Sequence, residues 1–258
     1  MVNVAVCIKY SIDVSNLKVD HANRTPITIG APRRMSDIDR RAVEEAIRIK
    51  ERCGGTVTAF TLGIPEARTC LREALAMGVD DAVLITDPLL ESSDTYITSK
   101  ALANALLKLG LFDIILCGET STDGYSYQVG PRIAEILNIP CITYAKSIAI
   151  SNGYVTVERD LEDRYEVVKT QLPVLITVTR EINEPRHPST ASMMKAFKKP
   201  IKTLNAKDVG INGLNPQVQV LKVFIPELKR KGIVFKDLPI KQSVAEVVKN
   251  LVKEGVLK

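Results

Sequence analysis

The chain contains no tryptophan, and aromatic residues make up only 5% of its 258 positions. Stacking of bases on aromatic side chains is a large part of single-stranded nucleic-acid binding, so this composition argues against a nucleic-acid-binding protein. The formal net charge of +5 includes a lysine cluster at Lys195, Lys198, Lys199 and Lys202. Such a cluster indicates either a docking surface for an acidic protein partner or a solvated face.

Signals for metal sites and membrane spans are also missing. The five cysteines form no C-x-x-C pair, and the two histidines, His21 and His187, stand apart. This spacing argues against a zinc or iron–sulfur site and favours buried free thiols. No apolar run has the length of a membrane span, and the amino end lacks a signal-peptide pattern. We therefore expect a cytoplasmic protein without a membrane span.

The usual catalytic motifs are absent as well. The sequence has no G-x-S-x-G elbow, no G-x-x-x-x-G-K-[ST] loop, no H-E-x-x-H helix, and no G-x-G-x-x-G after its first strand. The acidic pairs Glu44-Glu45, Asp80-Asp81 and Glu162-Asp163 are more typical of solvated charges than of an acid/base pair. These features favour a carrier or binding module over a hydrolase.

The first half of the chain alternates strand-like and helix-like segments. Apolar or β-branched runs predict strands over 2–9, 56–62, 82–85 and 114–117. Apolar residues at helical spacing, bounded by glycine or proline, predict helices over 36–53, 65–77, 95–109 and 129–139. This order predicts an α/β fold with a mostly parallel, doubly wound sheet and helices on both faces.

The pattern changes after residue 140. Strand-like segments over 142–150, 154–159, 165–170 and 174–179, with an Asn152-Gly153 turn, predict an antiparallel extension of the sheet. A small hairpin is expected from 17–20 and 26–29. Residues 203–240 are expected to be extended and loosely ordered, followed by an amphipathic helix capped by Ser243. We expect this C-terminal arm to bury its apolar stripe on this chain or on another subunit.

One stretch, residues 113–145, combines a strand, a polar loop and a helix start. Open α/β sheets bind nucleotides where such a loop leaves the carboxyl end of a parallel strand. The first amide groups of a helix suit a phosphate, and Gly118, Gly124 and Gly130 allow the backbone to approach a ligand. The alternative is an ordinary loop that only turns the chain, and the glycines alone do not decide between the two.

Several unconnected segments resemble the β subunit of electron transfer flavoprotein, including its nitrogen-fixation-type and bifurcating relatives. Residues 42–51 (AVEEAIRIKE) and 71–78 (LREALAMG) are similar to two helices of that family. Residues 157–177 (VERDLEDRYEVVKTQLPVLIT) resemble its signature segment, with Arg164 at a position that is usually acidic or glycine. Residues 183–195 (NEPRHPSTASMMK) resemble the segment that docks electron-transfer partners. The resemblance covers about residues 1–202.

The resemblance implies a heterodimer with a larger α subunit that carries an electron-transferring FAD. It also implies a second nucleotide in the β subunit, held at strand ends and helix starts. The residues at the matching positions are Cys7, Ser36, Asp37, Ile38, Asp39, Leu62, Gly63, Gly118, Glu119, Thr120, Ser121, Thr122, Asp123, Gly124, Tyr125, Ser126, Tyr127, Gln128 and Val129.

The identity of this second nucleotide stays open between FAD and AMP. AMP-type relatives often carry a run of acids in the loop, whereas here only Asp123 is charged past Glu119. Fewer acids repel a diphosphate less, which favours FAD. The resemblance then implies an electron carrier between dehydrogenases and a quinone reductase or ferredoxin, with NADH-dependent bifurcation if a second FAD is bound. The alternatives are a structural AMP-binding subunit of a one-flavin shuttle and a stand-alone adenine-nucleotide-binding protein.

The resemblance also divides the chain into parts with different roles. Residues 1–202 are expected to form the nucleotide-binding domain, with a partner-docking segment at 183–200. Residues 203–258 are expected to contact the α subunit. Two positions depart from the family: Thr190 stands where many members present a docking leucine, and Val14 stands where some present an aromatic residue toward the α-subunit flavin.

Overall fold

The computed structural model describes residues 1–211, 213, 215–227, 232–236 and 238–257. The chain divides into two compact units, Met1–Val223 and Phe224–Lys258. Within the described ranges, no helix is long and apolar enough to cross a membrane.

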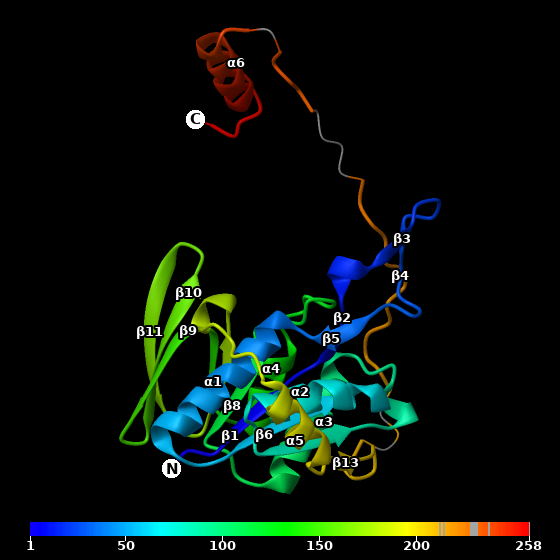
Figure 1. Ribbon diagram of the computed structural model, residues 1–258, viewed down its shortest axis with the longest axis vertical. Helices are drawn as coiled ribbons and strands as arrows, with labels where there is room; N and C mark the ends of the chain where they lie inside the picture. The colour runs from blue at the N-terminus through cyan, green and yellow to red at the C-terminus, as the bar shows by residue number, and fades with distance from the viewer. Residues whose placement is uncertain (212, 214, 228–231, 237, 258) are drawn as a thin grey trace. The chain divides into compact units, whose positions relative to one another are not determined.

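The main unit is built on one twisted sheet, in which the described residues form nine strands (Figure 1). Its spatial order is β11-β10-β9-β12-β8-β1-β6-β7-β13. The pairs from β9 through β12 and on to β13 are parallel, whereas β9–β10 and β10–β11 are antiparallel. The strands are β1 (Val4–Cys7), β6 (Val57–Leu62), β7 (Asp81–Ile85), β8 (Ile114–Gly118), β9 (Cys141–Ser151), β10 (Tyr154–Leu161), β11 (Arg164–Gln171), β12 (Val174–Val178) and β13 (Lys202–Leu204).

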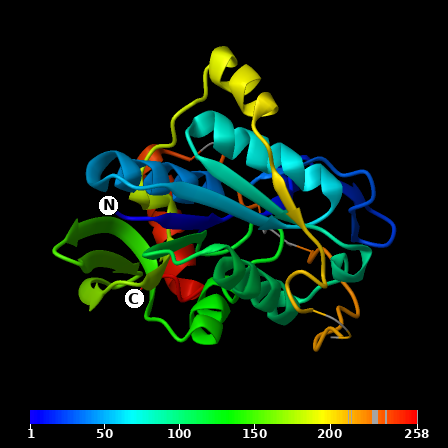
Figure 2. The ribbon, with the colours of Figure 1, turned by 90° about the horizontal axis from the view of Figure 1, so that it is seen from below.

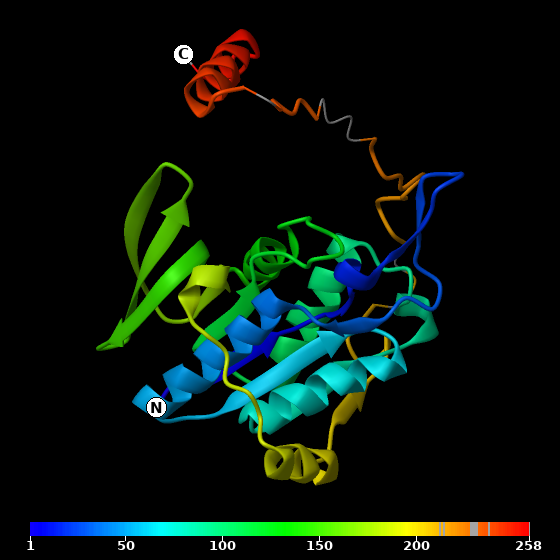
Figure 3. The same cartoon turned by 45° about the horizontal axis from the view of Figure 1, so that its top comes forward.

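Helices cover both faces of this sheet, as Figure 2 shows. The helices α1 (Asp37–Cys53) and α2 (Arg68–Met77) bury apolar side chains in one core, and α3 (Thr95–Leu109) and α4 (Val129–Leu137) bury theirs in the other. The helix α5 (Thr190–Lys198) lies against α2 on the outside (Figure 3). The predicted α/β class, with a mostly parallel sheet and helices on both faces, is therefore confirmed.

Local sequence explains most of these elements. The strand β1 reads VAVC and is buried along its whole length, as an inner parallel strand should be. The helix α1 starts at a Ser36 cap, whose Oγ accepts a hydrogen bond from the Asp39 amide at 3.1 Å. It ends at Gly54, and a Cβ at the next residue, Gly55, would meet the Val2 carbonyl oxygen at 2.2 Å. Only glycine permits this return of the chain to the sheet.

The hairpins form largely as expected. Asn152 and Gly153 both have positive φ, 51° and 76°, and connect β9 to β10 in the predicted antiparallel extension. The predicted small hairpin is present as β3 (Lys18–Asp20) paired with β4 (Thr25–Ile27), and β2 (Tyr10–Ile12) pairs with β5 (Arg33–Met35).

The position of one strand differs from the prediction. The sequence predicts residues 174–179 in the antiparallel extension, but β12 lies inside the sheet, parallel to both β8 and β9. The sequence of β12, VLITV, has no strongly polar side chain, and all five of its residues are buried. A strand that is buried on both faces lies inside a sheet that helices cover on both sides. The edge position is taken by β11, whose side chains alternate between exposed and half-buried along most of its length.

The segment after residue 202 is better ordered than expected at its start. The strand β13 pairs with β7, and Leu204, Ala206, Val209 and Ile211 are buried in the core beneath α3. The Asn104 amide of α3 donates to the Val209 carbonyl at 2.7 Å. The expectation of loose structure from 203 onward is therefore wrong for residues 203–211, and the expected domain boundary at 202 falls inside the main unit.

The second unit contains the helix α6 (Ile240–Lys253), which starts at a Pro239 cap. The predicted helix is present, but the predicted cap, Ser243, lies inside it. None of the described side chains of α6 is buried, so its apolar face is exposed within this unit.

Candidate functional site

A cavity of about 640 Å³ lies at the carboxyl ends of the central strands. Its floor includes Cys7 at the end of β1, Leu62 at the end of β6, and Cys117 at the end of β8. The strand β1 lies between β6 and β8, so the chain leaves it in one direction and later returns on its other side. This topological switch is where open α/β sheets bind ligands.

The start of α4 provides the most suitable place for an anion. Its N-cap residue, Gln128, makes no side-chain hydrogen bond to the first turn, and Gln128, Val129 and Gly130 line the cavity. The Gln128 side chain instead accepts a hydrogen bond from Thr95 Oγ1 at 2.8 Å. The start of α1, by contrast, is already capped by Ser36. The first-turn amides of α4 thus combine with the helix dipole to favour negative charge at this point.

The glycines of the loop have a structural reason beyond ligand approach. A Cβ at Gly118 would meet Asp39 Oδ1 at 2.6 Å, and one at Gly130 would meet the Thr177 methyl group at 2.7 Å. Both glycines therefore allow neighbouring elements to pack closely: α1 against β8, and α4 against β12. A Cβ at Gly124 would meet Ser121 Oγ at 3.0 Å, a contact that the loop could relieve by a small shift. Close packing alone therefore accounts for glycine at positions 118 and 130.

Asp39 is the buried carboxylate of the site. It is 5% exposed, and its Oδ2 accepts a hydrogen bond from the Lys9 amide at 2.9 Å. Burial raises the pKa of Asp39 to about 6, although hydrogen bonds from backbone amides act in the opposite direction. Its role in the fold is to join the start of α1 to the end of β1 beneath the cavity.

The polar loop is pinned to the segment after β1. Asp123 accepts from Lys9 Nζ at 2.7 Å and from the Ile12 amide at 3.1 Å. Burial would raise the pKa of Asp123, but the Lys9 hydrogen bond and charge outweigh it, so the pKa is lowered. The pKa of Glu119 is raised, first by burial and then by the nearby Glu181. The loop therefore contributes little uncompensated negative charge to the cavity at Asp123.

Most of the predicted site residues line this cavity together. They are Cys7, Asp39, Leu62, Gly63, Gly118, Glu119, Thr120, Ser121, Asp123, Gly124, Ser126, Tyr127, Gln128 and Val129. Three others, Ser36, Asp37 and Thr122, line a smaller cavity of about 170 Å³ together with Val14 and Arg180. Ile38 is buried in α1, and Tyr125 is exposed beside Tyr127.

The cavity lining also includes residues that the sequence did not predict. Lys9, Tyr10, Arg33, Leu90, Thr95, Thr98 and Leu102 also line the cavity. Lys9 and Tyr10 follow Cys7 directly, so their position after the first strand was a usable signal. Arg33 comes from β5 and Leu102 from α3, and only the fold brings these positions to the strand ends.

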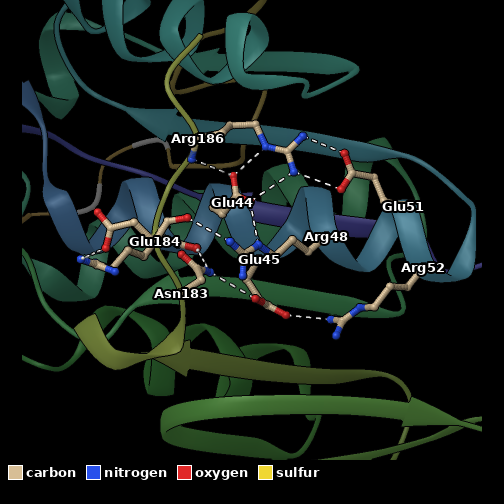
Figure 4. Close-up of polar contacts among 9 residues, drawn as sticks. Glu44, Glu45, Arg48, Glu51, Arg52, Asn183, Glu184 and Arg186 are labelled. Carbon is tan, nitrogen blue, oxygen red and sulfur yellow. Dashed lines mark hydrogen bonds and ion pairs between the residues drawn. The ribbon is translucent and has the colours of Figure 1, made fainter.

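The predicted docking segment is held on α1 by a polar network (Figure 4). Arg186 donates to Glu44 through Nε at 2.8 Å and to Glu51 through Nη1 at 2.7 Å. Asn183 Nδ2 donates to Glu45 Oε2 at 3.1 Å, and Arg48 Nη2 to the Glu184 carbonyl at 3.0 Å. These contacts join residues more than 130 positions apart and fix the chain path into α5.

Glu44 and Glu45 correct an expectation from the sequence. The sequence predicts solvated charges at both positions, but their side chains are only 2% and 4% exposed. Burial would raise the pKa of Glu44, yet hydrogen bonds from Arg186 and Arg48 outweigh it and lower the pKa. The free thiols were also expected to be buried, and this holds for Cys7, Cys70 and Cys117 but not for Cys141.

The helix α5 is fixed against α2 on its inner side. Arg72 donates to the carbonyls of Ala196 and Lys199, and Ala196 is buried. Met194 and Phe197 lie on the outer side, each 66% exposed. They are one helical turn apart, and Thr190 lies on the same stripe one turn earlier.

The sequence matches the electron transfer flavoprotein domain over residues 27–209. It is 40% identical over 257 residues to the electron transfer flavoprotein subunit beta of Thermoanaerobacterium thermosaccharolyticum, covering 97% of this chain and 96% of the relative. It is 35% identical to the caffeyl-CoA reductase-Etf complex subunit CarD of Acetobacterium woodii, covering 98% and 99%. It is 34% identical to protein FixA of Azorhizobium caulinodans, covering 96% and 94%. With its switch-point cavity and this similarity over nearly its full length, the chain belongs to the electron transfer flavoprotein family, on its β-subunit side.

Proposed function

We propose that this chain is the β subunit of a heterodimeric electron transfer flavoprotein and that its switch-point cavity holds a nucleotide of its own, FAD. The observation that carries the proposal is the position of the α4 start in the cavity wall, with first-turn amides that no side chain of the described residues caps. A diphosphate placed there would be met by backbone donors and by the positive end of the helix dipole.

The cavity residues fit such a group. Ser121, Ser126 and Thr95 supply hydroxyl groups, and Lys9 and Arg33 supply positive charge. Leu62, Leu90 and Leu102 give the apolar surface that an aromatic ring requires. When bound, FAD would supply the electron-transfer chemistry, and the protein would position it and shield it from water.

The choice between FAD and AMP rests on charge. The neutralisation of Asp123 by Lys9 leaves a loop that repels a diphosphate less than an acidic loop would. The cavity volume of about 640 Å³ is within the general range of small-molecule sites, about 300–1,000 Å³, and does not separate the two nucleotides. The charge of the loop supports FAD, with AMP as a structural ligand being the alternative.

The electron partners follow from the family and from α5. Two relatives carry names of reductase systems: the caffeyl-CoA reductase-Etf complex subunit of Acetobacterium woodii and the acryloyl-CoA reductase electron transfer subunit gamma of Anaerotignum propionicum. We infer that this chain serves a dehydrogenase on one side and a quinone reductase or ferredoxin on the other, with bifurcation from NADH when two FAD are present. The segment 183–200 would dock the dehydrogenase, and α6 would contact the α subunit.

The test is the nucleotide content of the heterodimer. The chain is co-expressed with its α subunit, purified, denatured, and the released nucleotides are separated and counted. Two FAD per heterodimer are expected. One FAD with one AMP would make this cavity an AMP site, and a heterodimer without any flavin would overturn the proposal as a whole.

A further inference from the structure

Three tyrosines form a continuous aromatic row where the loop before α4 meets β9. The rings of Tyr125 and Tyr127 lie edge to face with centroids 6.1 Å apart, and those of Tyr127 and Tyr144 lie tilted at 6.2 Å. The whole chain has only seven tyrosines and no tryptophan, so nearly half of its tyrosines gather here. Tyr127, at the centre of the row, lines the cavity.

All three tyrosines have the left-handed backbone conformation. Their φ angles are 46° at Tyr125, 56° at Tyr127 and 61° at Tyr144. A bulky residue is disfavoured in this region, and such conformations persist where the surrounding structure holds them, often at ligand sites. Here the Tyr125 amide donates to the Ser121 carbonyl at 3.0 Å, and the Tyr144 amide donates to Thr177 Oγ1 at 3.2 Å. The fold therefore holds these rings in place at a cost in backbone energy.

In the part of the chain that the structure describes, two of the three tyrosines are exposed. Tyr125 is 59% exposed and Tyr127 is 39% exposed, although their rings are apolar on both faces. Exposed aromatic rings beside a cavity are suited to stack on a flat ring of a ligand. The flanking carboxylate Glu119 lies close enough to raise the pKa of Tyr127, behind the larger effect of burial, which keeps the phenol neutral.

The row lies beside the α4 start, where the phosphates of a nucleotide would bind. A diphosphate at the α4 start would divide a dinucleotide into two ends. One end would lie over the apolar strand ends at Cys7, Leu62 and Cys117, and the other would lie over the loop that immediately precedes α4, where Tyr127 stands. AMP has one aromatic ring system, adenine, and would occupy only one of these two ends of the cavity. FAD has two aromatic ring systems, adenine and isoalloxazine, and would occupy both.

We propose that the Tyr125–Tyr127–Tyr144 row is the stacking platform for the isoalloxazine ring of the nucleotide in this cavity, so that it selects FAD over AMP. This inference rests on the proposed function, because it requires a nucleotide in the cavity. It makes Tyr127 a specificity-determining residue: removing its ring weakens the binding of FAD and leaves the binding of AMP unchanged.

The test compares ring removal with ring retention at Tyr127 in the full-length chain. Asparagine tolerates the left-handed conformation, so Tyr127→Asn removes the ring without adding backbone strain, and Tyr127→Phe keeps the ring. Tyr165→Asn, at a 62% exposed tyrosine on β11, is the matched control for losing a ring elsewhere. Dissociation constants for FAD and for AMP are measured by equilibrium ultrafiltration. Quenching of intrinsic fluorescence reports stacking directly, since tyrosine is the only strong emitter in a chain without tryptophan.

We expect Tyr127→Asn to weaken FAD binding by at least about fivefold, the low end of what one aromatic stack contributes. AMP binding should be unchanged, and Tyr127→Phe and Tyr165→Asn should bind both nucleotides as the original chain does. Equal weakening of FAD and AMP, or unchanged FAD binding, would overturn the platform while leaving the nucleotide site intact. Failure of the original chain to bind either nucleotide would instead overturn the nucleotide site, and the platform with it.

Discussion

Asp39 shows how a single buried carboxylate links the fold to the cavity. Its oxygens are aimed at the Lys9 amide and at Gly118, where a side chain would collide with it. Lys9, whose charge also acts on Asp39, is paired with Asp123. Asp39 therefore carries its negative charge in a buried place, where backbone amides, the Ser36 hydroxyl and the Lys9 charge offset only part of the cost of burial, and this cost depends on pH.

We predict that Asp39→Asn flattens the pH dependence of stability of the nucleotide-free chain. The pKa of Asp39 is about 6 in the folded state against an ordinary value of 3.8 for an aspartate, so the folded chain binds more protons between these values. The unfolding free energy should then fall as the pH rises through this window, by up to ~3 kcal/mol for this one group. Chemical denaturation of both proteins at several pH values between about 4 and 7 measures it. Two curves that run parallel would contradict this prediction.

Residue-level features were predictable from the sequence where the partner is nearby in the chain. The Ser36 cap bonds three residues ahead, and the Asn152-Gly153 turn acts on its own backbone. The burial of Glu44 could not be predicted in this way, because Arg186 lies 142 positions away and no local pattern signals it. An ion pair with a residue far away in the sequence allows acidic side chains to be buried on a helix, where the local sequence alone predicts that they are exposed.

At the scale of elements, α1 contributes both to the wall of the cavity and to the anchoring of the docking segment. Its first turn closes the cavity through Asp39, and its middle holds the docking segment through Glu44, Glu45 and Glu51. The segment from Asn183 to α5 is thus part of the rigid body that carries the cavity. A docking helix that is already fixed loses less conformational freedom when a partner binds.

We predict that Arg186→Gln loosens the docking segment without unfolding the cavity. The change leaves Glu44, 2% exposed, with Arg48 as its remaining cationic partner, and we expect a loss of about 1–3 kcal/mol in the free energy of unfolding. Hydrogen exchange should rise across residues 183–198, while the amides of β1 and β8 keep their protection.

The matched control for this prediction is Arg41→Gln. Arg41 pairs with Glu184 at 3.4 Å, but the Glu184 side chain is 87% exposed, so this pair should contribute little. Equal exchange in the two variants, or no change at Arg186→Gln, would show that the Glu44 contact does not hold the segment.

The order of strands and helices in the first half of the chain was predictable. Each element there has apolar residues at the spacing typical of its type, and a glycine or proline marks where most of the helices end. The placement of β12 was not, since a run of five apolar residues fits an antiparallel or a parallel strand equally well until its burial is known. The cavity was predictable in outline from the loop at 118–129. Its second wall, from α3 and β5, comes from elements whose approach to the strand ends depends on the complete fold.

At the scale of the whole chain, the two units differ in how far their apolar side chains are buried. Among the described residues, the buried residues of the two cores lie between Val2 and Ile211. The second unit exposes Val244, Val247, Val248 and Val252 on one face of α6, each between 42% and 56% exposed. Such a stripe in water is unfavourable, and with the cores complete without it, a surface on another subunit is its expected place.

We predict that removing residues 241–258 weakens assembly with the α subunit and leaves the thermal unfolding midpoint of the isolated chain unchanged. None of the described side chains of α6 is buried, and the buried residues of the two cores end at Ile211, so we expect the main unit to keep its stability without the helix. Val244→Ser with Val248→Ser should reproduce the effect, and Glu246→Ser with Lys249→Ser, which removes the i,i+3 ion pair of α6, should not. Co-purification of each variant with the α subunit, together with calorimetry of the chain alone, makes the comparison. A lowered unfolding midpoint would place the helix on this chain instead, and undiminished co-purification would show that the α subunit is held elsewhere.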